Sequence, residues 1–63
     1  VPDDLRAALD ANPAASARFD TLTAQNRWAI LFRLMSVKAA ATRATRIASY
    51  VEMLDRGETI YPQ

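Results

Sequence analysis

The sequence predicts an all-α protein: a compact, orthogonal four-helix domain with a central, apolar third helix. Three observations predict this fold. The 63 residues include a single Gly and abundant Ala, the residue with the highest helix propensity. Apolar side chains recur at the three- and four-residue spacing of helices. The connections between the predicted helices are short, and the first two helices are too short to flank a regular up-down bundle.

The predicted elements each have recognisable ends. Pro2, followed by two acidic residues, is typical of a helix start. Asn12 and Pro13 end the first helix and begin the second as its N-cap and first residue. Thr23 is the predicted N-cap of the third helix, and Gly57 follows the fourth as its C′ residue. In order, the prediction is helices over residues 3–11, 13–20, 24–38 and 40–56, with an irregular tail over 57–63.

The third helix carries the broadest apolar surface in the chain. Its apolar residues are Trp28, Ile30, Leu31, Phe32, Leu34, Met35 and Val37. Because this arc is much wider than about 100°, we expect contacts on two sides and therefore a central position. Core packing explains its aromatic and Met side chains better than a cofactor site does.

The fourth helix has a predicted core row at helical spacing, made of Ala44, Ile47, Val51 and Leu54. Beyond it, Ile60 and Tyr61 either fold back onto the helices or meet another domain. One domain is expected, because 63 residues lie near the lower limit for independent folding.

The composition argues against several classes of function. With no Cys and no His, the chain has no thiolate or imidazole ligands, and no acidic cluster has EF-hand spacing. We therefore expect no metal and no cofactor. No Gly-rich phosphate loop occurs, and no evident base accompanies the hydroxyl groups, so we expect no catalytic residues and no enzymatic activity.

The chain also lacks the features of a membrane or exported protein. No run of about eighteen apolar residues predicts a membrane span, and no signal peptide opens the sequence. We therefore expect a cytoplasmic location. The first residue is Val rather than Met, as in a processed chain or a piece of a longer polypeptide.

Charge is distributed unevenly although the net charge is only +1. Residues 1–17 carry −2, residues 18–46 carry +5 and residues 47–63 carry −2. Such a basic middle is either neutralised internally when the acidic ends fold against it, or presents a positive surface to an anionic partner.

The most unusual segment is VKAAATRATRI, at the predicted start of the fourth helix. Lys38, Arg43 and Arg46 crowd a position where the helix dipole favours acids. In one explanation Arg43 is a structural clamp that forms a bidentate pair with a carboxylate. Asp20 is the first candidate for that carboxylate and Asp10 the second.

In the other explanation the same segment binds an anion. Helix N–H groups, the Thr42 hydroxyl and the cations Lys38, Arg43 and Arg46 would converge on phosphate or carboxylate. Tyr50, four residues after Arg46, could stack with it as a cation–π pair and extend the surface. The candidate anion- or partner-binding residues are Lys38, Thr42, Arg43, Arg46 and Tyr50.

Three stretches resemble one protein family. These are VPDDLRAAL at the start, K-x-x-x-T-R-x-x-R-I from Lys38 to Ile47, and VEML-x-x-G from Val51 to Gly57. Together they resemble the bacteriocin-protection, YdeI/OmpD-associated (OmdA) family over nearly the whole chain. Phe19, Leu22, Asn26 and Arg27 also stand in the expected order.

The resemblance implies a small, mainly helical bacterial domain associated with tolerance to antimicrobial peptides or envelope stress, without a catalytic mechanism. The family's basic motif falls on Lys38, Thr42, Arg43 and Arg46. The chain departs from the family where Pro-Glu is usual, because it has Ala40-Ala41. The missing acid leaves the cations less compensated locally.

We therefore expect a non-catalytic interaction or accessory module that binds a protein partner or a neighbouring domain. The edge formed by Tyr50 and Met53 is a candidate contact surface. The alternative is an anion- or nucleic-acid-binding module that uses the basic start of the fourth helix. Against that alternative, the net charge is near zero and the third helix is too apolar to enter a groove.

Overall fold

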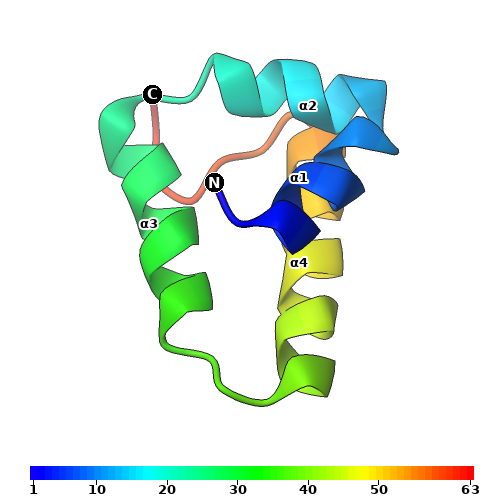
Figure 1. Ribbon diagram of the computed structural model, residues 1–63. Coiled ribbons are helices and arrows are strands. Elements are labelled where there is room, and N and C mark those ends of the chain that lie inside the picture. The colour runs from blue at the N-terminus through cyan, green and yellow to red at the C-terminus, as the bar shows by residue number, and fades with distance from the viewer.

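Four helices make up the computed structural model, which describes residues 1–63 (Figure 1). They are α1 (Asp3–Asp10), α2 (Pro13–Asp20), α3 (Ala24–Met35) and α4 (Ala40–Asp55). α3 and α4 run alongside each other in opposite directions, and α2 lies crosswise near the end of α4. The predicted all-α fold with four helices is confirmed. None of the helices has both the length and the hydropathy needed to cross a membrane.

The predicted N-caps of α2 and α3 are present. The Asn12 side chain accepts a hydrogen bond from the Ala15 N–H at 3.1 Å, and Pro13 is the first residue of α2. The Thr23 hydroxyl oxygen accepts from the Asn26 N–H at 3.3 Å. Each cap satisfies one of the N–H groups that the first turn of a helix leaves without a partner.

The end of α4 is a Schellman motif around Gly57. The Gly57 N–H donates to the Leu54 carbonyl and the Glu58 N–H to the Met53 carbonyl, both at 3.0 Å. Gly57 has φ of +78°, a left-handed conformation that is strained for residues with a Cβ. The predicted role of this glycine is confirmed.

α3 ends at Met35, three residues before the predicted end at 38. In a longer helix the Leu34 carbonyl would accept the N–H of Lys38. Here it accepts the Val37 N–H at 3.1 Å and a guanidinium N–H of Arg43 at 2.9 Å. Residues 36–39 therefore leave the helix and connect to α4.

The core lies where α1, α2 and α3 meet α4, the helix against which all three pack. Ile47 and Leu54 of the predicted α4 row are buried, Val51 is half-buried and Ala44 is exposed. Ala44 faces an open groove instead, so its predicted burial is wrong. The buried apolar residues are Leu5, Leu9, Ala15, Phe19, Leu22, Ile30, Leu34, Ile47 and Leu54.

The predicted central position of α3 needs correction in one respect. Ile30 and Leu34 are buried against the core, but Trp28, Phe32 and Met35 are 56%, 61% and 68% exposed. α4, rather than α3, is the helix that the other helices share. The broad apolar arc of α3 does have two sides, but this chain covers only one of them.

The tail folds back onto the start of α3, which is the first of the two alternatives for this segment. Asn26 is 1% exposed; its amide nitrogen donates to the Tyr61 carbonyl at 2.9 Å and its amide oxygen accepts the Tyr61 N–H at 2.7 Å. The Gln63 side-chain oxygen accepts from Asn26 at 2.9 Å and from the Thr23 N–H at 3.0 Å. Asn26 therefore fastens the tail to α3.

Candidate partner-binding surfaces

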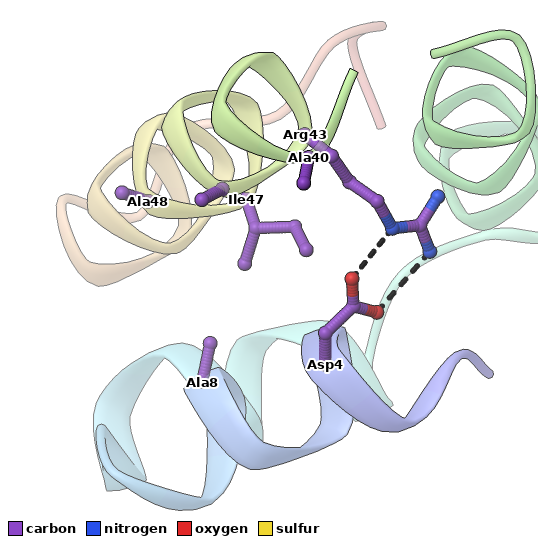
Figure 2. A pocket seen from close by; sticks show the side chains of 7 residues that line it. Asp4, Ala8, Ala40, Arg43, Ile47 and Ala48 are labelled. Atoms are coloured by element: carbon purple, nitrogen blue, oxygen red, sulfur yellow. Dashed lines mark hydrogen bonds and ion pairs between the residues drawn. The ribbon is translucent and has the colours of Figure 1, made fainter. Parts of the chain in front are cut away.

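Within the basic segment, Arg43 is the residue whose side chain bonds to other helices. Its guanidinium donates two hydrogen bonds to the Asp4 carboxylate, at 2.5 and 3.1 Å (Figure 2). A third, at 2.9 Å, goes to the Leu34 carbonyl at the end of α3. The Arg43 side chain is 25% exposed and that of Asp4 47% exposed, so the pair lies at the molecular surface. One side chain thus connects α1, α3 and α4.

The predicted pairing of Arg43 with Asp20, or with Asp10, is wrong: the carboxylate belongs to Asp4. Asp4 lies in the first turn of α1, which packs against the first half of α4 (Figure 2). Asp10 is the last residue of α1, and Asp20 ends α2, which crosses α4 near its other end (Figure 1). The predicted bidentate geometry itself is present.

This pair changes the electrostatics at the start of α4. Hydrogen bonds from Arg43, supported by the Leu5 N–H, hold the pKa of the Asp4 carboxyl below its usual range. The hydrogen bond to Asp4 raises the pKa of the Arg43 guanidinium further. An acid from α1 therefore takes the place of the local acid that the first turn of α4 lacks.

A shallow apolar groove of about 310 Å³ lies between α1 and α4, beside the Asp4–Arg43 pair. Ile47 lies at its centre, and the ion pair closes one end (Figure 2). The groove exists because its walls are alanines, whose side chains leave space between two packed helices. They are Ala8, Ala40, Ala44 and Ala48.

The other predicted binding residues are not gathered around Arg43. Thr42 and Arg46 line a shallow depression on the exposed side of α4, and neither side chain forms a hydrogen bond or ion pair. Lys38 is exposed in the connection that precedes α4. Tyr50 is half-buried and packs against the core. The candidates therefore do not form one enclosed site.

The predicted cation–π pair between Arg46 and Tyr50 does not form. The cation–π contact in the structure joins Arg27 and Phe19, with the guanidinium carbon 5.8 Å from the ring centroid. The structure also contains no group of three or more acidic side chains placed to hold a metal ion.

α3 exposes three large apolar side chains, Trp28, Phe32 and Met35, which we define as the α3 ridge. The Trp28 and Phe32 rings contact each other, with centroids 5.4 Å apart and planes tilted by 41°. The predicted core packing of these three side chains is wrong. A signal was present, because Ile30 and Leu34 form a separate apolar pair on the opposite side of the helix. The two apolar rows lie on opposite sides of one helix, and this chain covers only one of them.

Comparison with known proteins identifies the family. No curated protein and no solved structure matches this chain. The family model described as Bacteriocin-protection, YdeI or OmpD-Associated (OmdA) matches residues 1–57. The match includes α1, the Asp4–Arg43 pair, the α3 ridge and the Gly57 cap. The chain therefore belongs to the OmdA family.

Proposed function

We propose that this domain is a non-catalytic interaction module with a bacteriocin-protection role, which acts by binding another protein through the α3 ridge. The observation that carries the proposal is the exposure of Trp28, Phe32 and Met35, each more than half exposed on a helix whose opposite side is buried. Full burial of one such side chain is worth about 1.5–3 kcal/mol. A partner that covers the ridge would therefore gain favourable free energy of binding from the apolar surface that it buries.

Other features support an interaction role over catalysis. The sequence has neither His nor Cys, the usual proton-transfer and thiolate residues. The hydroxyl groups of Thr21, Ser36 and Thr45 each donate to a backbone carbonyl three or four residues earlier, at 2.8 to 3.0 Å. These hydroxyls are used in local structure, and no base is poised to activate them. Membership of the OmdA family supports the protective role.

A survival assay tests the proposal. Bacteria that lack their own OmdA proteins would express the wild-type domain in the cytoplasm and be exposed to a pore-forming bacteriocin. We expect protection by the wild type and loss of protection by the ridge variant W28S/F32S/M35S. The matched control is D10S/A14S/A17S, which changes three exposed residues on α1 and α2. Equal protection by both variants would show that protection does not need the ridge. If the wild type gives no protection, the protective role itself is excluded.

The alternative function, anion binding at the start of α4, has weaker support. In its favour, the first turn of α4 has no side-chain cap and no acid, and Lys38 and Arg46 are unpaired. Against it, Arg43 is already occupied by Asp4. Titration with phosphate at low ionic strength tests it through backbone amide shifts. Saturable shifts on residues 38–46 would support the anion site, and scattered shifts would exclude it.

A further inference from the structure

The ridge has the geometry of a helix that docks onto another helix. Trp28, Phe32 and Met35 follow one another at i, i+4 and i+7, the spacing of anchor residues on helices that bind apolar grooves. Asn26, Ile30 and Leu34 occupy the opposite side of α3 and are all buried. The ridge is thus a straight row of large side chains directed away from the core.

α3 and the connection that follows it carry basic charges and no acidic ones. The chain contains no Asp or Glu between Asp20 and Glu52. Arg33 and Lys38 are exposed, and neither forms a salt bridge. Arg27, next to Trp28 in α3, lies over the Phe19 ring. Charge complementarity therefore favours a partner with carboxylates beside its apolar surface.

Two other occupants fit these charges less well. A second copy that packed ridge to ridge would bring together two α3 helices that each carry basic and no acidic side chains. An anionic lipid surface is recognised by clusters of about 4–8 basic residues. α3 and the connection that follows it carry three, Arg27, Arg33 and Lys38. Aromatic, Met and Arg side chains are instead the residues enriched in protein–protein interfaces.

We propose that the α3 ridge binds an acidic amphipathic helix of a partner protein. The inference rests on the proposed function, since it names the chemistry of the partner at the same surface. Trp28, Phe32 and Met35 supply the apolar contact. Arg33 and Lys38 select the partner by pairing with Asp or Glu side chains beside its apolar stripe.

A pair of designed peptides tests this proposal. Both are three-heptad amphipathic helices with Leu at the apolar positions; one carries Glu at the flanking positions and the other carries Lys. Binding to the 63-residue protein is followed by the amide shifts of the labelled protein and by the anisotropy of a fluorescently labelled peptide. We expect the Glu peptide to bind at least tenfold more tightly than the Lys peptide, with saturable shifts on α3. Its affinity should fall as salt is added.

Charge reversal supplies the decisive variant. R33E/K38E should weaken binding of the Glu peptide at least tenfold and favour the Lys peptide instead. The control R6E/R18E makes the same change in net charge at exposed positions on α1 and α2, and should leave the preference for Glu intact. Circular dichroism of each variant establishes that it is folded. W28S/F32S should abolish binding of both peptides.

Several outcomes would overturn the proposal. These are equal binding of the two peptides, shifts scattered away from α3, and a preference unchanged by R33E/K38E. If the protein self-associates and the ridge variant does not, the ridge binds a second copy of the chain instead. Ridge-dependent binding to vesicles of phosphatidylglycerol and phosphatidylcholine, without peptide binding, would assign it to a membrane. If the ridge variant loses protection in cells but the Glu peptide does not bind, the proposed interaction role stands. Only the proposal that the partner is an acidic helix is then rejected.

Discussion

Arg43 and Asp4 join the first turn of α4 to the first turn of α1 through two hydrogen bonds from one guanidinium to one carboxylate. Arg43 also donates to the Leu34 carbonyl, so the same side chain is bonded to the last turn of α3. A planar guanidinium has enough donors for all three bonds, whereas a lysine ammonium cannot reproduce the fork. The unusual basic start of α4 is therefore partly a structural device.

Replacement of Arg43 should destabilise the fold. Arg43→Ala removes all three hydrogen bonds and leaves Asp4 unpaired, so we expect a lower midpoint of thermal unfolding by circular dichroism. Arg43→Lys should recover only part of the loss. Arg46→Ala is the matched control on the same helix: Arg46 has no partner, so its removal should leave the midpoint unchanged or raise it slightly. Equal midpoints for Arg43→Ala and the wild type would contradict the clamp.

The same pair predicts how stability depends on pH. Since Arg43 depresses the pKa of Asp4 in the folded state, the stabilisation is complete above the unfolded-state pKa of about 4. The stabilisation from the Asp4–Arg43 pair should be lost as the pH falls through the lower pKa of Asp4 in the folded state.

Asp4→Asn removes this titration, so urea unfolding of both proteins between pH 2 and pH 7 isolates it. The wild type should be the more stable protein near pH 7, and the difference should shrink at the acid end. If the difference in the free energy of unfolding between the two proteins does not change with pH, the charge of Asp4 does not contribute to stability.

Leu34 and Met35 are neighbours in α3 with opposite environments. Leu34 is 0% exposed and Met35 68% exposed. Leu34→Ala should cost about 2–5 kcal/mol, as usual for truncation of a buried Leu. Because the core of a domain of this size rarely supplies more than about 3–5 kcal/mol, this variant should be largely unfolded. Met35→Ala should change the free energy of unfolding by less than about 0.5 kcal/mol in urea titrations. A large loss from Met35→Ala would place the ridge in the fold rather than at a binding surface.

Asn26 should be more important than an ordinary polar residue of a helix. Asn26→Ala leaves the part-buried Tyr61 N–H without its acceptor and removes one donor to the Tyr61 carbonyl. We expect a loss of about 1–3 kcal/mol, together with faster hydrogen exchange at the Tyr61 amide. Gln25→Ala, at the exposed neighbouring position, should have little effect on either measurement. Unchanged exchange at Tyr61 in the Asn26 variant would show that other contacts hold the tail.

The sequence was sufficient for features set by local chemistry. Asn12, Thr23 and Gly57 act as caps within a few residues of their own position, so their roles follow from residue type and spacing. The carboxylate that meets Arg43 was not predictable in this way. Its identity depends on how α1 packs against α4, and no local pattern encodes that placement.

The same distinction explains the errors in α3. Its apolar pattern predicts a helix with two surfaces to cover, but it does not say whether the second cover lies in the same chain. At the early end of the helix, the Leu34 carbonyl accepts a hydrogen bond from Arg43 of another helix, which no local pattern in α3 encodes. The binding role of Lys38, Thr42, Arg46 and Tyr50 stays a prediction. Asn26 was missed because its partners are 35 and 37 residues away in the chain.

The exposure of Trp28 also determines what its fluorescence reports. It is the only tryptophan in the chain, and its indole is largely hydrated in the folded protein as it would be in the unfolded one. Its emission wavelength should therefore change little on unfolding. A partner that covers the ridge would transfer the indole to an apolar environment and shift its emission to the blue. The native protein thus carries an intrinsic optical probe that responds to docking far more than to folding.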